Sequence, residues 1–297
     1  QFDPDNYGVI DAPPVGAEQW QSLGAGRALL MVHGTFSRAA GAFCALPRDF
    51  VQTLSTRYGG RLFALDHPTL SQDPKQNIEW FLNQVPDGTA LDLDIVCHSR
   101  GGLVSRMLTE HIDRFALGNR RVNIGKVVFV AAPNAGTVLA DPKHVGDFID
   151  SYTNILNFFP DTMVLDTLQA ILAVVKQIAV GALAGLDGLQ SMVPGGTFLG
   201  DLNQARTSKA TYYALASNFE PADKGLLDYA KDVLLDKLFA KDNDLIVPTE
   251  GVWDQNGGSL FPIAEHFVFT GSDAVQHNGY FGNAVAREKI LGWLTPS

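Results

Sequence analysis

The turn around Ser99 constrains the fold of this chain more than any other part of the sequence. A strand-like run, Leu91–Cys97, leads into His-Ser-Arg-Gly-Gly, and a helical pattern starts at Leu103. A strand, a tight turn and a helix in this order form the context of a nucleophile elbow, in which a serine is exposed on a strained turn. Because the turn brings strand and helix close together, the residues two before and two after the serine must be small. Gly101 meets this requirement and Cys97 nearly does.

Ser99 also has a simpler interpretation, as the capping residue of an ordinary strand-to-helix turn. We favour the nucleophile, because the other parts of a catalytic site follow in the expected order along the chain. The free N–H groups and the positive dipole end of the following helix would then point at the serine and favour a developing oxyanion. His98 adjoins the serine in sequence and therefore points elsewhere, so we interpret it as a packing residue.

Short runs of β-type residues alternate with longer helical patterns along the whole chain, which predicts a mostly parallel sheet flanked by helices. We expect one α/β domain over residues 1–297, because no Pro/Ser-rich linker or charge run divides it. The predicted strands are Ala28–His33, Leu62–Asp66, Leu91–Cys97, Lys126–Ala131, Tyr212–Ser217 and His266–Thr270. The clearest predicted helices are Leu103–Phe115, Leu226–Phe239 and Ala284–Leu294.

Composition and charge argue against several classes of protein. The formal net charge of -10 repels phosphate backbones and no Lys/Arg cluster compensates for it, so we expect no nucleic-acid partner. The most apolar stretch, Leu165–Leu186, is interrupted by charged residues, amides and glycines, so we predict no transmembrane helix. Cys97 lies in a predicted buried strand, so we expect no disulfide with Cys44. Cysteine usage is therefore compatible with a secreted or a cytoplasmic protein.

A serine hydroxyl needs a base to take its proton at neutral pH, and a carboxylate must hold the tautomer of that base. In the fold built around a nucleophile elbow, the chain order is serine, then an acid, then histidine. Our candidate base is His277, which lies in a polar stretch between the last predicted strand and the last helix. The alternative is His266, which lies inside the last predicted strand, where a side chain is more often packed.

Three carboxylates are candidates for the acid. Asp244 is the first choice, because it lies in a turn just ahead of a short apolar segment, Leu245–Val247. Asp242 is a neighbour that could replace it. Glu220 directly follows the predicted strand Tyr212–Ser217, where the simplest members of the fold place their acid.

The predicted strand before residue 34 supplies the second half of an oxyanion-binding site. It ends in His33-Gly34, and the glycine lets the following loop turn close to a substrate carbonyl. In this fold the N–H after such a pair joins the N–H after the nucleophile to bind the oxyanion. The predicted donors are therefore the main-chain N–H groups of Thr35 and Arg100, and we interpret His33 as structural.

With these residues placed, the chain resembles the lipase and esterase branch of the α/β-hydrolase superfamily, and in parts the bacterial triacylglycerol lipases. The resemblance spans Arg27–Leu294 and is carried by Val32-His33-Gly34, by the turn around Ser99, by Asp244 with the apolar segment after it, and by His277. It implies an α/β-hydrolase fold with a Ser99–His277–Asp244 triad. It also favours Asp244 over Glu220, because those enzymes place the acid after an excursion beyond the strand.

Residues 137–208 interrupt the alternation of strands and helices, and about eighty residues between two strands far exceed the usual connection. Apolar residues at steps of three and four predict a helix with a broad apolar face. The resemblance implies that this insertion is a helical lid or cap lining an acyl pocket; the alternative is a helix packed permanently on the core. The candidate substrate-binding residues are Phe36, Phe158, Phe159, Met163 and Ile171.

The function implied is hydrolysis of a carboxylic ester, of a small molecule or a lipid, through an acyl-enzyme. Transient contact with a lipid surface is expected, and no cofactor. The calcium-binding aspartate pattern of the bacterial lipases is not evident, so we predict no metal. Cys97 and Arg100 depart from the family, which has glycine and commonly glutamine there. The alternatives are an acyltransferase, a polyester or thioester hydrolase, or a non-catalytic binding protein on the same fold.

Overall fold

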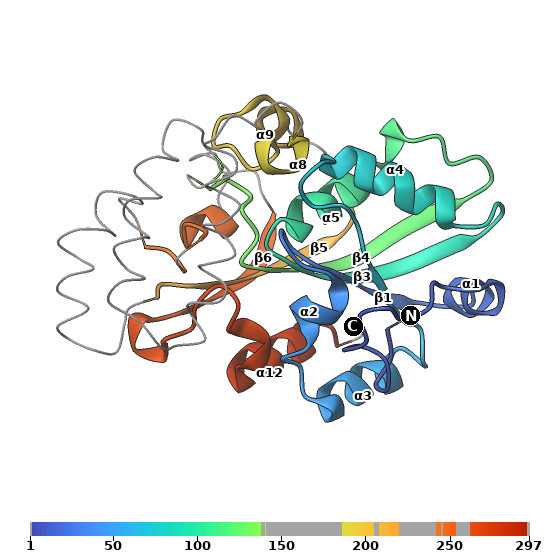
Figure 1. Cartoon of the computed structure of the whole chain (residues 1–297), viewed down its shortest axis with the longest axis horizontal. Coiled ribbons are helices and arrows are strands. Elements are labelled where there is room, and N and C mark those ends of the chain that lie inside the picture. The colour runs from blue at the N-terminus through green and yellow to red at the C-terminus, as the bar shows by residue number, and fades with distance from the viewer. Residues whose placement is uncertain are drawn as a thin grey trace.

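A parallel sheet forms the centre of the molecule. The computed structural model describes residues 2–137, 140, 186–204, 208–219, 242–244, 246–253 and 262–295. Within these residues, six strands form one sheet in the order β2-β1-β3-β4-β5-β6, and every neighbouring pair is parallel (Figure 1). The strands are β1 (Ala28–Val32), β2 (Leu62–Leu65), β3 (Ala90–His98), β4 (Arg121–Val130), β5 (Thr211–Ser217) and β6 (Ile263–Phe269). This confirms the predicted sheet and all six predicted strands.

Helices cover both faces of the sheet (Figure 1). Buried side chains of α1, α4, α5, α8 and α9 belong to one core cluster, and those of α2, α3 and α12 belong to a second one. The α-helices are α1 (Ala17–Gly24), α2 (Ala39–Phe43), α3 (Arg48–Arg57), α4 (Pro74–Gln84), α5 (Gly101–Glu110), α8 (Asp187–Gln190), α9 (Thr197–Leu202) and α12 (Ala284–Trp293). The short 3-10 helices are η1 (Ile112–Arg114), η4 (Glu250–Val252), η5 (Gly271–Asp273) and η6 (Tyr280–Gly282).

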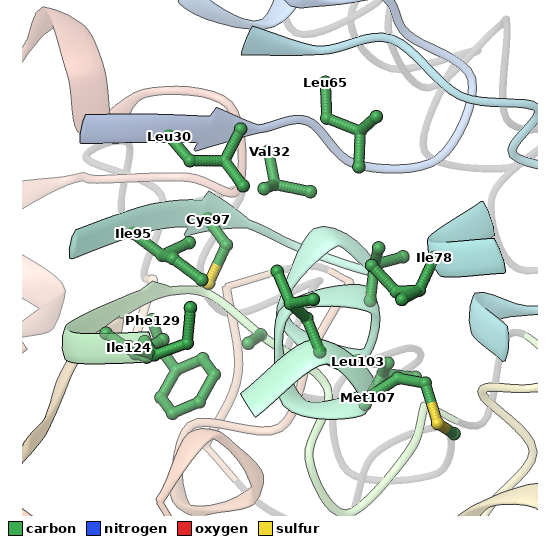
Figure 2. Close-up of a cluster of buried hydrophobic side chains, with 14 of the residues drawn as sticks. Leu30, Val32, Leu65, Ile78, Ile95, Cys97, Leu103, Met107, Ile124 and Phe129 are labelled. Atoms are coloured by element: carbon green, nitrogen blue, oxygen red, sulfur yellow. The ribbon is translucent and has the colours of Figure 1, made fainter. Parts of the chain in front are cut away.

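The central strands are buried on both faces, which explains why they read as unbroken apolar runs. Successive side chains of a strand point to opposite faces of the sheet. In β1, Leu30 and Val32 join the first core cluster, whereas Leu29 and Met31 join the second. Figure 2 shows the first cluster, where side chains of β1, β3 and β4 meet those of α5. The sheet is therefore a rigid platform that fixes where its carboxyl ends lie.

β3 and β5 each begin one residue earlier than predicted, and two further strands begin earlier by a wider margin. β4 starts at Arg121 instead of Lys126, because its first half is polar and only partly buried and gives no apolar run. β6 starts at Ile263 instead of His266 and ends at Phe269, because this edge strand is largely exposed over its first residues.

The helix after the Ser99 turn is shorter than predicted. α5 ends at Glu110, and His111 leaves the helical backbone before the 3-10 turn η1, so the predicted helix Leu103–Phe115 is divided. α12 agrees with its prediction to within one residue. The predicted helix Leu226–Phe239 lies outside the described residues. None of the helices in the described ranges is long and apolar enough to span a lipid bilayer.

A buried carboxylate stabilises the bulge in β3 near the amino end of the sheet. The pairing of β3 with β4 shifts register between Leu93 and Ile95, and Asp94 fills this position. Asp94 accepts hydrogen bonds from the Tyr58 hydroxyl (2.8 Å), the Arg27 guanidinium (3.0 Å) and the Lys126 main-chain N–H (2.9 Å). Three donors on three segments therefore depend on one side chain.

We expect Asp94→Ala to lower the free energy of unfolding by about 3 kcal/mol, because it leaves the buried Tyr58 hydroxyl and the Lys126 N–H without their acceptor. Urea denaturation measures this loss. Asp92→Ala is the matched control on the same strand. Asp92 is exposed, and among the described residues its only hydrogen bond is from the exposed Asn123 amide, so we expect a change below about 0.5 kcal/mol. Equal losses in the two variants would contradict this role of Asp94.

Candidate active site

Ser99 lies in a tight turn between β3 and α5, with a backbone φ of 54°. This left-handed conformation is costly for a residue with a side chain, so the surroundings must hold it in place. The Ser99 N–H donates to the Val130 carbonyl at 2.9 Å, and the Gly102 N–H donates to the Ser99 carbonyl at 2.8 Å. The strained turn between strand and helix is the backbone geometry expected of a nucleophile elbow.

Three glycines let the turn approach its neighbours closely. A Cβ on Gly34 would lie 2.6 Å from the Ser99 Cβ, so the loop after β1 passes directly over the serine. A Cβ on Gly101 would lie 2.5 Å from the Val32 carbonyl oxygen, and one on Gly102 would lie 2.3 Å from the Ala132 Cβ. None of these three sites has room for a side chain, so the elbow is packed between the ends of β1 and β4.

Cys97 occupies the position where the resemblance to the α/β-hydrolases implies a glycine. Its side chain is fully buried in the first core cluster (Figure 2). Its sulfur lies 3.4 Å from the Val128 carbonyl oxygen. The space two residues before Ser99 therefore admits a thiol, whereas the two positions that follow Arg100 have room only for glycine.

Asp244 and His277 form a buried hydrogen-bonded pair. The His277 Nδ1 lies 2.8 Å from the Asp244 Oδ2, and the His277 main-chain N–H donates to the Asp244 carbonyl at 3.0 Å. The other carboxylate oxygen accepts from the N–H groups of Ile246 (3.1 Å) and Val247 (2.8 Å). With Nδ1–H donating to the carboxylate, the second ring nitrogen of His277 is left to act as a base.

The surroundings of Asp244 keep it ionised. Burial by itself raises the pKa of this carboxyl, but the charge and the hydrogen bond of His277 and the two main-chain N–H groups outweigh burial and lower the pKa below its ordinary value. The carboxylate can therefore hold the tautomer of His277 at neutral pH and stabilise the imidazolium when it forms.

The Tyr280 hydroxyl donates a further hydrogen bond to the Asp244 Oδ2, at 3.1 Å. Burial and the charge of Asp244 raise the pKa of Tyr280 well above its usual range, so the hydroxyl stays a donor. Sequence reasoning missed Tyr280, because its return to Asp244 is a tertiary contact. The only local signal is its position three residues after His277, at the start of η6.

His98 connects the elbow to the segment of His277. The His98 Nε2 lies 2.9 Å from the His277 carbonyl oxygen, and the two rings are 4.8 Å apart. Burial lowers the pKa of His98 to about 3, so a neutral ring with Nε2–H donates this bond. His98 does pack as expected, here against the rings of His277 and Phe281, and it also holds the main chain of His277 beside the turn of Ser99.

The two alternative candidates within the described residues, His266 and Asp242, do not join this cluster. His266 lies on the exposed part of β6 and stacks on Trp253, with ring centroids 4.4 Å apart. The Asp242 side chain is exposed, and its carbonyl accepts the Thr249 N–H. Glu220 lies outside the described residues.

The loop after β1 lies against the elbow through Gly34, and it carries the predicted donor Thr35. Neither the Thr35 N–H nor the Arg100 N–H has an acceptor within the described ranges. Phe36 has a φ of 58° and its N–H donates to the Thr69 hydroxyl at 3.2 Å, which fixes the loop beyond Thr35. Buried His33 lies 2.9 Å from the Gly34 carbonyl oxygen through its Nδ1, in agreement with a structural role.

Four of the five predicted substrate-binding residues, Phe158, Phe159, Met163 and Ile171, lie outside the described residues, as does most of the predicted insertion 137–208. Phe36 is described, and its side chain is 36% exposed beside the loop of Thr35.

Comparison with known proteins places the chain in a family. Residues 1–295 match the sequence model of a family described as Domain of unknown function (DUF7379). The chain belongs to this family. No curated protein is significantly similar in sequence to this DUF7379 member.

Solved structures of bacterial lipases share the fold of this DUF7379 member. The mature lipase BlEst2 of Bacillus licheniformis has a TM-score of 0.53 at 15% identity, covering 91% of this chain and 92% of its own. The Staphylococcus hyicus lipase has a TM-score of 0.51 at 11% identity, covering 95% and 93%. Lipase 1 from Pelosinus fermentans has a TM-score of 0.50 at 15% identity, covering 91% and 99%. The fold is the expected α/β-hydrolase fold.

We expect Tyr280→Phe to raise the pKa of Asp244, because it removes one donor to the carboxylate. A lowered carboxyl pKa adds stability that is present at neutral pH and is lost as the pH falls through the folded pKa. The variant should therefore unfold with a free energy about 2 kcal/mol lower at pH 7. This deficit should shrink as the pH falls below the ordinary value of 3.8.

Urea denaturation between pH 7 and pH 3 tests this prediction. Tyr213→Phe is the control, because Tyr213 stacks on Trp293 and no hydrogen bond from its hydroxyl to a carboxylate is found within the described residues. A deficit in Tyr280→Phe that is constant with pH would show that the hydroxyl does not act through the charge of Asp244.

Proposed function

We propose that this protein is a serine hydrolase that cleaves carboxylic esters, with Ser99 as nucleophile, His277 as general base and Asp244 as the acid that orients it. The observation that carries the proposal is the buried Asp244–His277 hydrogen bond of 2.8 Å, whose histidine is held by His98, the residue before the elbow serine. A histidine oriented by a carboxylate beside a serine on a strained turn is the arrangement that activates a hydroxyl for acyl transfer.

The proposed reaction begins when the Ser99 Oγ attacks the ester carbonyl carbon and His277 takes the hydroxyl proton. The carbonyl oxygen becomes an oxyanion bound by the N–H groups of Thr35 and Arg100, and the positive end of α5 favours the same charge. The C–O bond of the ester then breaks, the proton passes from His277 to the leaving alcohol, and an acyl-Ser99 remains. Water, deprotonated by His277, attacks the acyl group, and the acid leaves as Ser99 regains its proton.

Two observations support an ester with an apolar acyl group as the substrate. The three solved structures of similar fold reported above are named as lipases. In addition, Phe36 places a partly exposed aromatic side chain directly after the proposed donor Thr35. An apolar group beside the bound carbonyl favours burial of an acyl chain at about 25 cal/mol per Å² of apolar surface.

A fluorophosphonate probe tests the nucleophile. Mass spectrometry of the labelled protein should find one adduct, on the peptide that contains Ser99, and Ser99→Ala should abolish it. The absence of an adduct on Ser99 would refute the proposed function.

Hydrolysis of p-nitrophenyl butyrate tests the two partners. We expect His277→Ala and Asp244→Asn each to lower kcat by about 10⁴-fold, because one removes the base and the other its orientation. His266→Ala and Asp242→Asn are the matched controls and should stay within about threefold of the wild type. Near-normal turnover in a partner variant would assign its role to the neighbouring histidine or carboxylate instead.

A further inference from the structure

Arg100 carries a buried guanidinium directly after the proposed nucleophile. Its side chain is fully buried, and its Nε donates to the Gly188 carbonyl at 2.9 Å and approaches the Ser191 hydroxyl at 3.4 Å. Its Nη1 donates to the Asn77 side-chain carbonyl at 3.1 Å, and its Nη2 donates to the Gln72 carbonyl. All four of these acceptors are neutral.

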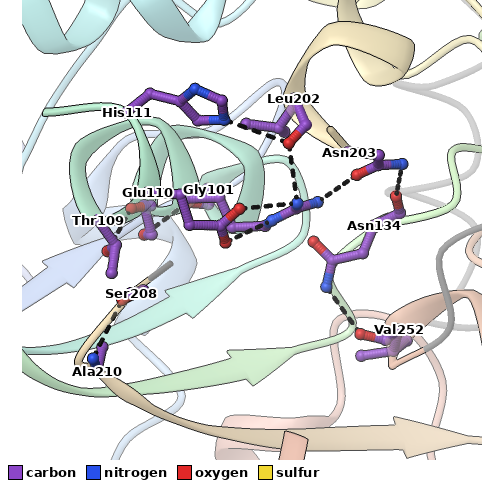
Figure 3. A network of polar contacts seen from close by, with 12 residues as sticks. Gly101, Thr109, Glu110, His111, Asn134, Leu202, Asn203, Ser208, Ala210 and Val252 are labelled. Carbon is purple, nitrogen blue, oxygen red and sulfur yellow. Dashed lines mark hydrogen bonds and ion pairs between the residues drawn. The ribbon is translucent and has the colours of Figure 1, made fainter. Parts of the chain in front are cut away.

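A buried cation without a carboxylate partner is unusual, because taking an ion out of water costs several kcal/mol. Within the described ranges, no carboxylate forms a salt bridge with Arg100. Burial lowers the pKa of its guanidinium to about 9, and the charge of Asp73 offsets this only in part. Arg106, inside α5, is almost as deeply buried but forms a salt bridge with Glu110 at 2.8 Å. Figure 3 shows Glu110, Leu202 and Asn203, the partners of this second guanidinium. A need to bond several segments at once would explain why an arginine occupies position 100.

The acceptors of Arg100 come from three segments that converge on the elbow. Gln72 lies in the loop after β2, Asn77 lies in the first turns of α4, and Gly188 lies in α8. The start of α4 is fixed by an N-cap, in which the Asp73 carboxylate accepts a hydrogen bond from the Gln76 N–H at 2.8 Å. The guanidinium therefore joins the elbow to three segments, of which α4 has a cap that does not depend on it.

The same segments also contact the loop that carries the second proposed oxyanion donor. The Gly188 N–H donates to the Leu70 carbonyl at 2.9 Å, and a Cβ on Gly188 would lie 2.2 Å from the Thr69 carbonyl oxygen. Thr69 in turn accepts the Phe36 N–H. On the other side, the Thr35 hydroxyl lies 3.8 Å from the sulfur of Met192, directly after Ser191. A continuous set of contacts thus runs from the Arg100 side chain to the loop 34–36.

We propose that Arg100 is a positioning residue for oxyanion binding, whose guanidinium fixes its own main-chain N–H relative to that of Thr35 through the segments 69–72 and 188–192. This inference rests on the proposed ester hydrolysis. A planar guanidinium presents five N–H donors in a fixed fork, so it can bond acceptors on three segments at once. A lysine has one flexible point charge and a glutamine has two donors, so neither can reproduce this geometry.

The test uses Arg100→Lys, Arg100→Gln and the milder Asn77→Ala. The last variant keeps the guanidinium but removes one of its acceptors, together with the two bonds that the Asn77 amide donates to the Pro68 carbonyl and the Gln72 side chain. Two quantities are measured for each: kcat and KM with p-nitrophenyl butyrate, and the inhibition constant of butylboronic acid, which forms a tetrahedral anion on a reactive serine. We expect kcat to fall by about 100-fold in both Arg100 variants and by about 10-fold in Asn77→Ala, with KM within about threefold of the wild type.

The inhibition constant of the boronic acid should rise in the same order as kcat falls, because both report binding of a tetrahedral anion. The matched control is R106Q/E110Q, which removes the buried guanidinium inside α5 together with its partner. It should lower the melting temperature but leave kcat and the boronic acid constant within about threefold of the wild type. A purely structural role for Arg100 predicts that its variants behave like this control.

Wild-type kcat and boronic acid binding in Arg100→Lys would overturn the proposal. The proposal would also fail if the fall in kcat in every variant were fully explained by a smaller fraction of folded protein. If both Arg100 variants do not fold, Asn77→Ala decides, and its normal kcat would overturn the inference. The wild type is examined first with the fluorophosphonate probe: without an adduct on Ser99 the proposed function itself fails, whereas a labelled wild type with an unaffected Arg100→Lys refutes only the role of Arg100.

Discussion

The close packing of the Ser99 turn against the ends of β1 and β4 is the constraint on which the rest of the site depends. A non-glycine residue in the left-handed region costs on the order of 1 kcal/mol or more, and main-chain bonds to the neighbouring strand hold it there. Gly34, Gly101 and Gly102 make the approach sterically possible. Because both flanking strands are buried on their two faces, the turn has little freedom to relax.

Asp244 and His277, the proposed acid and base, lie in loops that follow β5 and β6, and hydrogen bonds rather than strand pairing hold their side chains. The carboxylate of Asp244 receives His277, Tyr280 and two main-chain N–H groups, so both of its oxygens are satisfied although it is buried. A buried carboxylate whose two oxygens both accept hydrogen bonds is held in one orientation before any reaction begins. His98 extends the same network back to the elbow.

Much of this arrangement could be predicted from the sequence, because it depends on local patterns. The apolar runs locate all six strands. The turn signals select Asp244 and His277, which the structure joins by a hydrogen bond, and Ser99, which lies in the expected strained turn. The first half of β4 was not predicted as strand, because it is polar and partly exposed and therefore gives no apolar run.

The supporting residues could not be predicted, because their roles arise from contacts between segments far apart in the chain. Nothing near Tyr280 indicates that its hydroxyl returns to a carboxylate thirty-six positions earlier. Likewise, an arginine after a serine gives no hint that its side chain bonds Asn77 and Gly188. These roles depend on the direction of the side chain and on its tertiary partners, and the spacing of residues along the sequence reveals neither.

The thiol beside the elbow also has a chemical consequence. Burial raises the pKa of Cys97 to about 12, so almost none of it is thiolate at neutral pH, and no solvent reaches it. Alkylating agents and peroxides act on exposed thiolates, so they should leave Cys97 intact. Cys44, at the exposed end of α2, is the thiol that such reagents would modify. The elbow of this chain therefore tolerates oxidising and reducing surroundings alike, although a sulfur atom lies two residues from its serine.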